Sequence, residues 1–278
     1  MDLIEKTLSL LKKGEIIVAP TDTVYGLFGD ATSDIAVQRI YKIKNRPMCN
    51  PLIAHVSSIN MAKMYTELSS ENKELIDIFW GNSGSPITFV VPLRKNSSIS
   101  SFVTAGLGTL AIRMPSHPVS LEIINKFGKP LAAPSANTST FLSPTSADMV
   151  KKDLGNKVPL IIDAGKCVVG VESTILDITE KPYRILRHGG LPLEDIEKTI
   201  GQKILKKAQE DVIRSPGMMK KHYSPSIKVR MNASFPLEGE AFIAFGETDI
   251  KYDANLSESG SLAEAARNLF SALKFCDD

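Results

Sequence analysis

Apolar residues along the chain follow two alternating patterns. Short runs rich in branched side chains predict buried strands, and apolar residues spaced about every three to four positions predict amphipathic helices. We expect strands over residues 16–19, 52–56, 87–92, 109–114, 130–133, 160–163, 173–178 and 183–187. We expect helices over about 3–13, 34–44, 59–66, 70–80, 117–127, 146–154 and 193–201. Alternation of this kind is typical of an α/β fold with a mixed sheet.

Two serines mark expected helix starts. Ser33 and Ser70 lie where helical patterns begin, and a serine hydroxyl can accept a hydrogen bond from a free amide of the first turn. We therefore expect both residues to be N-caps.

The pattern changes after the last of these helices. Residues 202–226 are polar and contain prolines and a glycine that disfavour both helix and strand, so we interpret them as a linker. Strand-like patterns follow at 227–231 and 241–245, and a helix with an apolar stripe covers 261–273. We therefore expect a main domain at 1–201, a linker at 202–226 and a small α/β segment at 227–278.

The composition excludes several classes of protein. Of the 278 residues, 43% are hydrophobic and 23% are charged, as in ordinary soluble domains. A net charge of +2 is weaker than the basic excess typical of dedicated nucleic-acid binders. The sequence shows no signal peptide, and no run approaches the roughly 18 apolar residues of a membrane span. We expect no membrane partner.

The cysteines Cys49, Cys167 and Cys276 are isolated, and the sequence has no C-x-x-C motif. Separated cysteines in odd number predict neither a disulfide framework nor a zinc site. The pattern fits a reducing compartment, so we expect a cytoplasmic protein.

Polar clusters follow the predicted strands, although the common phosphate loops G-x-x-x-x-G-K-[ST] and G-x-G-x-x-G are absent from the sequence. Active sites of α/β proteins lie at such strand ends. Each cluster also has a structural alternative. Residues 20–26 are consistent with a capped turn, 44–47 with cations at a helix C-terminus, and 133–139 with a polar loop.

Two polar residues fall inside apolar strands. His55 lies in the strand at 52–56, where a lone histidine is more often a hydrogen-bonded core residue than a ligand contact. Arg113 lies near the end of the strand at 109–114, and a buried arginine needs a partner. A carboxylate or phosphate ligand would supply that partner, and a purely structural role is the alternative.

The polar clusters form an ordered set of motifs. In chain order they read P-T-D-T-V-Y-G-L, K-x-R-P-x-x-N-P-L, R-M-P-x-H-P, A-P-S-A-N, S-P-T, V-E-S-T and S-P-G-M-x-x-x-H-Y-x-P. This set resembles the YrdC-like family of threonylcarbamoyl-AMP synthases, in the longer form that carries a C-terminal domain. The resemblance is dense over about 12–225, and it favours ligand binding over the structural alternatives.

The resemblance implies an open, twisted α/β sheet with flanking helices and a positively charged cleft. It implies a reaction in which L-threonine, bicarbonate and ATP give threonylcarbamoyl-AMP and pyrophosphate. Mg²⁺ is expected with ATP, and we identify no protein ligand for it. A downstream threonylcarbamoyl transferase complex would then modify an adenosine beside the anticodon of certain tRNAs.

The resemblance also assigns residues to the two ends of this cleft. The family's nucleotide-binding tetrad, which we also expect to be catalytic, matches Lys44, Arg46, Ser135 and Asn137. Further nucleotide contacts are expected from Asn50, Ser143 and Arg187. Threonine contacts are expected from Thr21, His55, Arg113 and Ser173. Fixed cations and donors would offset the repulsion between a carbamate and ATP in a partly dry cleft.

The linker and the C-terminal segment gain roles from the same resemblance. In the long form the linker crosses the cleft, so we expect His222 and Tyr223 to approach the nucleotide as part of a lid that excludes water. The family's C-terminal domain is longer than residues 227–278, so we expect a shortened or truncated domain here.

Two other functions are alternatives. A carbamoyltransferase of the hydrogenase-maturation type uses a similar domain, but that family also carries paired C-x-x-C zinc motifs, which this sequence lacks. A non-catalytic RNA-binding module is the second alternative, and weak binding of tRNA or double-stranded RNA is compatible with the resemblance. The near-neutral charge argues against RNA binding as the main function.

Overall fold

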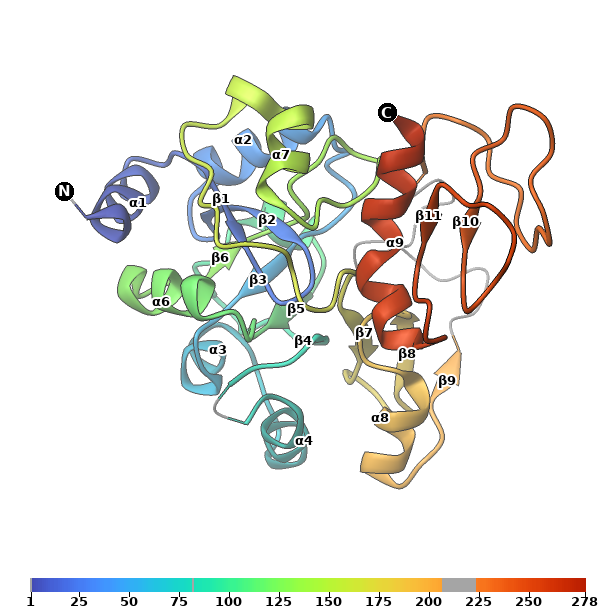
Figure 1. Cartoon of the computed structure of the whole chain (residues 1–278). Coiled ribbons are helices and arrows are strands. Elements are labelled where there is room, and N and C mark those ends of the chain that lie inside the picture. The colour runs from blue at the N-terminus through green and yellow to red at the C-terminus, as the bar shows by residue number, and fades with distance from the viewer. Residues whose placement is uncertain (1, 82, 207–223) are drawn as a thin grey trace.

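A large mixed sheet dominates the computed structural model, which describes residues 2–81, 83–206 and 224–278 (Figure 1). Within these residues, nine strands pair in the order β1-β2-β6-β3-β5-β4-β7-β8-β9. Their bounds are β1 Ile17–Pro20, β2 Tyr25–Asp30, β3 Ile53–His55, β4 Ile87–Pro92, β5 Thr109–Arg113, β6 Leu131–Ala132, β7 Thr174–Asp177, β8 Arg184–Arg187 and β9 Leu205–Lys206. Parallel and antiparallel pairs both occur, which confirms the predicted α/β fold with a mixed sheet.

Helices surround this sheet and bury their apolar faces against it (Figure 1). Their bounds are α1 Leu3–Lys12, α2 Asp34–Lys44, α3 Ile59–Tyr65, α4 Ser70–Trp80, α5 Ser101–Thr104, α6 Pro118–Phe127, α7 Ala147–Leu154 and α8 Leu193–Ile200. Ser33 caps α2 as predicted, because its hydroxyl accepts from the Ala36 amide at 3.3 Å. The cap of α4 is Ser69 rather than the predicted Ser70, since the Ser69 hydroxyl accepts from the Asn72 amide at 3.0 Å.

Two errors in the strand prediction lie within the main domain. Tyr25–Asp30 forms β2, a fully buried strand between β1 and β6, although its two glycines and the polar cluster before it resemble a loop. The segment 160–163 forms only an isolated bridge, in which Ile161 pairs with Val18 of β1. The short helix α5 was also not predicted.

The C-terminal segment contains a parallel pair of short strands, β10 Ile243–Ala244 and β11 Ala254–Asn255, and the helix α9 Leu262–Asp277. The helix was predicted, but 227–231 is not a strand, and its apolar side chains are exposed. Figure 1 shows α9 lying between this strand pair and the main domain.

The predicted linker is only partly described. Near its start, Leu205–Lys206 form β9, which extends the main sheet by pairing in parallel with β8. His222 and Tyr223 lie outside the described residues, so their expected place over the nucleotide stays a prediction. None of the described helices has both the length and the apolarity needed to cross a membrane.

Candidate active site

Lys44 connects two of the polar clusters, 44–47 and 133–139, which lie about ninety positions apart in the sequence. It is the last residue of α2, which ends at Asn45 in a left-handed conformation with φ of 50°. The Lys44 side chain is buried, and Nζ donates to the backbone oxygens of Ser135 at 2.5 Å and Asn137 at 2.6 Å. Burial, followed by the nearby Arg46 charge, lowers the pKa of Lys44 to about 7. The structure therefore places a titratable ammonium under the 135–137 loop.

Arg46 and Asn137 hold the neighbouring backbone. Arg46 donates from Nε to the Asn50 carbonyl at 3.1 Å and from Nη2 to the Pro51 carbonyl at 2.8 Å. The Asn137 amide donates to the carbonyls of Thr138 at 2.8 Å and Phe141 at 3.0 Å. These bonds shape the loops around the expected tetrad.

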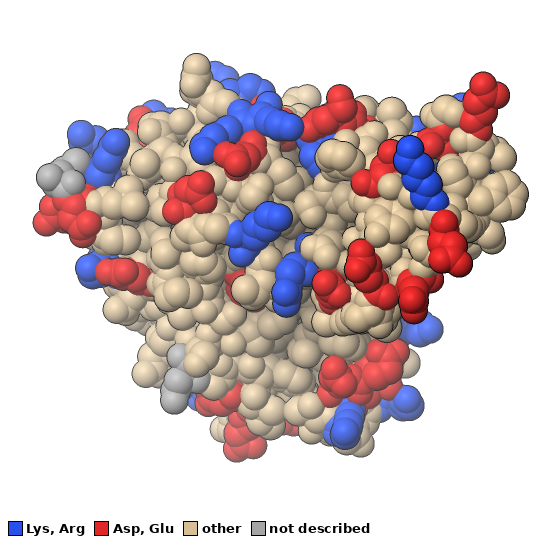
Figure 2. Space-filling model, in the orientation of Figure 1, with Lys and Arg blue, Asp and Glu red and all other residues tan. Residues whose placement is uncertain are grey.

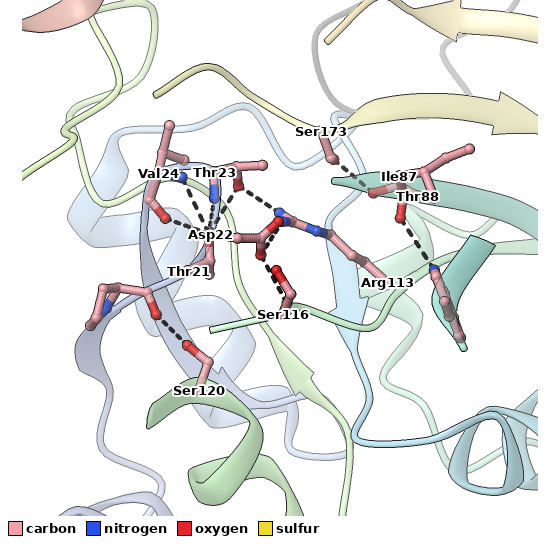
Figure 3. A network of polar contacts seen from close by, with 12 residues as sticks. Thr21, Asp22, Thr23, Val24, Ile87, Thr88, Arg113, Ser116, Ser120 and Ser173 are labelled. Atoms are coloured by element: carbon pink, nitrogen blue, oxygen red, sulfur yellow. Dashed lines mark hydrogen bonds and ion pairs between the residues drawn. The ribbon is translucent and has the colours of Figure 1, made fainter. Parts of the chain in front are cut away.

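Arg113 meets a carboxylate of the protein itself, as Figure 3 shows. Its Nη2 lies 2.6 Å from Asp22 Oδ1, and its Nη1 donates to the Thr23 hydroxyl at 2.7 Å. The same Asp22 oxygen accepts from the Ser116 amide at 3.1 Å, and Thr21 is bonded to Thr23 through their hydroxyls at 2.9 Å. The sequence indicated that Arg113 needs a partner, but it did not single out Asp22.

His55 lies directly beside Arg113, because β3 and β5 pair in parallel with these two residues in register. The imidazole is buried and packs edge-on against Phe28, with ring centroids 5.6 Å apart. Burial, with a smaller effect from Arg113, lowers the pKa of His55 to about 3. His55 is therefore neutral at physiological pH, and its Nδ1 finds no hydrogen-bond partner among the described residues.

Arg187, at the end of β8, organises a second polar network. It lies 3.3 Å from Glu172 through Nη1 and Oε2, and its Nη2 and Nε donate to the hydroxyl and carbonyl of Ser173, each at 3.0 Å. Ser143 donates to Glu172 at 2.7 Å, and the Ser173 hydroxyl is 2.7 Å from that of Thr88 (Figure 3). Glu172 was not among the predicted site residues, although it lies in the V-E-S-T motif.

These groups converge on one small cavity of about 30 Å³. All four expected threonine contacts line it, and so do three of the expected nucleotide contacts: Thr21, His55, Arg113 and Ser173, with Arg46, Ser135 and Arg187. The cavity is therefore a small polar site at which the expected threonine contacts meet part of the expected nucleotide contacts.

Of the expected nucleotide contacts that the structure describes, four do not line this cavity. Lys44 donates to the backbone of the 135–137 loop, and the Asn50 carbonyl accepts from Arg46. The Ser143 hydroxyl donates to Glu172. Asn137 instead lines a neighbouring cleft of about 540 Å³, which lies between the main domain and the C-terminal end of α9. The expected nucleotide residues thus extend from the cavity into this cleft.

The parts of the chain that the structure describes contain no group of three or more His, Cys, Asp or Glu side chains placed to hold a metal ion. Mg²⁺ in nucleotide-using enzymes is commonly held by phosphate oxygens, water and only one or two carboxylates. The expected Mg²⁺ stays a prediction, and we assign it no step.

Surface charge does not form a single-sign field on the face seen in Figure 2, where Lys and Arg are interspersed with Asp and Glu. Such a surface is unlike the basic stripe of a dedicated nucleic-acid binder.

Comparisons with known proteins cover nearly the whole chain. The Sua5/YciO/YrdC family model, described as "Telomere recombination", matches residues 9–189. A second model, described as "Threonylcarbamoyl-AMP synthase, C-terminal domain", matches residues 191–278.

Individual relatives match over similar lengths. Threonylcarbamoyl-AMP synthase of Pyrococcus abyssi is 38% identical over 96% of this chain and 83% of its own length. The enzyme of the same name from Schizosaccharomyces pombe is 40% identical over 94% of this chain and 69% of its own length. The crystal structure of P. abyssi Sua5 complexed with L-threonine superposes with a TM-score of 0.87 at 36% identity, covering 99% of this chain and 85% of that one. The chain therefore belongs to the Sua5/YciO/YrdC family.

Proposed function

We propose that this chain is a threonylcarbamoyl-AMP synthase, which joins L-threonine, bicarbonate and ATP. The observation that carries the proposal is the convergence of Arg46, Arg113 and Arg187 on one polar cavity, with Lys44 beneath the adjoining loop. This concentration of cations suits a reaction between two anions. The relatives whose names state this activity support it.

The proposed reaction forms two bonds. The threonine amine attacks the carbon of bicarbonate, and loss of water gives a carbamate. A carbamate oxygen then attacks the α-phosphorus of ATP, the bond from that phosphorus to the bridging oxygen breaks, and pyrophosphate leaves with the electron pair. Positioning and charge neutralisation would supply most of the rate enhancement, since the described residues offer no obvious general base.

Threonine would bind at the end of the cavity formed by Thr21, His55, Arg113 and Ser173. The buried Nε of Arg113 has no partner among the described residues, so its N–H donor is unused there. A guanidinium that Asp22 already orients can present this donor to the threonine carboxylate without moving its other two nitrogens. His55 would contribute a neutral surface that adds no charge to the pocket.

ATP would bind along the expected tetrad of Lys44, Arg46, Ser135 and Asn137, with Asn50, Ser143 and Arg187 completing its site. We further propose that residues 1–201 form the catalytic domain, that 202–226 link it to 227–278, and that His222 and Tyr223 cover the nucleotide. Three free cysteines fit the reducing cytoplasm as its location. The product would pass to a threonylcarbamoyl transferase complex that acts on tRNA, with tRNA itself bound weakly at most.

The proposal is tested by following release of pyrophosphate from labelled ATP while threonine or bicarbonate is omitted in turn. We expect release only when both are present, together with an adenylate that carries both threonine and the labelled α-phosphate. Release that does not depend on threonine would refute the proposed reaction. Binding of RNA without any turnover of ATP would favour the RNA-binding alternative.

A further inference from the structure

We propose that helix α9 holds the loops of the candidate active site in their relative positions, and that Phe270 is the positioning residue through which it acts. The kinetic part of this inference rests on the proposed function, and its structural part does not. The helix lies beside these loops although it belongs to the C-terminal segment (Figure 1).

Phe270 is the centre of an apolar contact between the two parts of the chain. Its side chain is 6% exposed and belongs to one buried cluster with Val24 and Leu142, against which Val171 also packs. Each of these partners is a sequence neighbour of a polar site residue, since Val24 follows Thr23, Leu142 precedes Ser143, and Val171 precedes Glu172. One phenyl ring therefore supports all of these loops.

The backbone of α9 also touches the loop that leads to Glu172. Gly170 has φ of +77°, and a Cβ at this position would lie 2.4 Å from Cα and O of Arg267. Only a glycine permits this close approach. Arg267 in turn donates from Nε to the Val168 carbonyl at 2.8 Å. The helix is thus fixed to this loop by polar as well as apolar contacts.

Backbone hydrogen bonds connect the supported loops to one another. The amides of Val169 and Gly170 donate to the carbonyls of Asp22 at 2.9 Å and Thr23 at 3.1 Å. The amide of Tyr25 donates to the Pro144 carbonyl at 2.8 Å. Since Asp22 and Thr23 hold Arg113, and Glu172 holds Arg187, displacement of Phe270 would disturb both arginines.

The test compares Phe270→Ala with Phe275→Ala, a matched control on the same helix at a residue that is 66% exposed. Hydrogen exchange in the full-length protein would follow the amides of Tyr25, Val169 and Gly170. We expect roughly tenfold faster exchange at these amides in Phe270→Ala, because exchange reports local opening, and no change in the control. This readout requires no substrate.

Turnover would be measured on the same proteins as threonine- and bicarbonate-dependent release of pyrophosphate. We expect kcat to fall on the order of tenfold in Phe270→Ala, with smaller changes in KM, because the loops no longer hold the reacting geometry. Phe270→Leu keeps an apolar side chain of similar size and should restore most of kcat. A role confined to stabilising the C-terminal segment would leave kcat unchanged at a temperature where both variants are folded.

The outcomes separate the two proposals. Faster exchange with reduced kcat supports the inference, while unchanged exchange at these amides in Phe270→Ala overturns it. If exchange is faster in Phe270→Ala but the wild-type protein releases no pyrophosphate, the proposed function is refuted and the mechanical link between α9 and the loops is supported.

Discussion

The candidate site holds its cations in two different ways, which distinguish an arginine half, with Arg113 and Arg187, from a lysine half, with Lys44. Arg113 and Arg187 each lie against a carboxylate, Asp22 at 2.6 Å and Glu172 at 3.3 Å. Lys44 is equally buried, but its nearest partners are neutral backbone oxygens. The arginine half therefore keeps fixed, oriented charges, whereas the lysine half can gain or lose a proton near neutral pH.

This difference would matter for a site that binds a polyanion, as proposed here for ATP. Among the described residues, no side-chain carboxylate lies within hydrogen-bond distance of Lys44, so a phosphate that approached it would favour the protonated amine. A substrate carboxylate that approaches Arg113 instead joins a guanidinium whose orientation Asp22 already sets. The following predictions test this contrast.

The largest effect is expected from Asp22→Asn, which leaves the buried Arg113 charge uncompensated. Removing one member of a buried ion pair costs about 3–5 kcal/mol, so the free energy of unfolding should fall by this amount. Unfolding in urea would measure it. The control is Glu122→Gln, which breaks the exposed ion pair with Lys126 and should change stability by less than about 1 kcal/mol. Equal effects of the two variants would show that Asp22 does not balance Arg113.

Lys44→Ala, which changes the lysine half of the site, should abolish most of the protein's turnover. Loss of one positioned charge or donor typically lowers the rate on the order of 10²–10³-fold. The assay is threonine-dependent release of pyrophosphate, with circular dichroism to show that the fold persists. Lys42→Ala, which removes an exposed lysine from the same helix, is the control and should retain activity. Similar losses in both variants would contradict a specific role for Lys44.

The free energy of unfolding should depend on pH through Lys44. The pKa of this residue is about 7 in the folded protein and 10.5 for an ordinary lysine, so between these values the unfolded chain binds a proton that the native protein does not. Stability contributed by Lys44 therefore rises with pH over this window. The difference in stability between wild type and Lys44→Met should grow in favour of wild type from about pH 7 to pH 10. A difference independent of pH would indicate that Lys44 stays charged.

The smallest effect is expected from Cys49→Ser. Cys49 lies between Arg46 and Asn50 in sequence, but its side chain is exposed and forms no disulfide in the described structure. Substitution of an exposed residue usually changes stability by no more than about 0.5 kcal/mol, and turnover should change by less than about twofold. A large loss of turnover would mean that this loop contacts substrate through Cys49.

Much of the fold follows from hydrophobic periodicity. The predicted helices are present because their apolar stripes pack on the sheet, and most strands are present because their branched residues are buried. β2 was missed because Gly26 and Gly29 weaken the local strand pattern, and its position between β1 and β6 depends on contacts distant in sequence. The strand prediction for 227–231 was wrong for the opposite reason. The local pattern there is strand-like, but its residues are exposed and join no sheet.

The candidate site was predictable only in part. The motifs identified hydroxyls and cations, but not the acids that balance them. Physical reasoning required a partner for Arg113, yet many carboxylates could have supplied it, and only the β1–β2 turn brings Asp22 to the required place. The same applies to Glu172, whose contact with Arg187 depends on the pairing of β7 with β8.

The site draws its residues from Thr21 to Arg187, which has a consequence for the order of events during synthesis. No fragment shorter than residues 22–187 contains both arginine networks, so a nascent chain cannot complete the cavity until β8 has left the ribosome. Contacts between such distant positions also form slowly, because long loops must close before the contacts can stabilise them. If α9 supports the loops as proposed, a further stretch of chain must emerge before the site is complete. Early translation products would then be folded in part but unable to consume ATP.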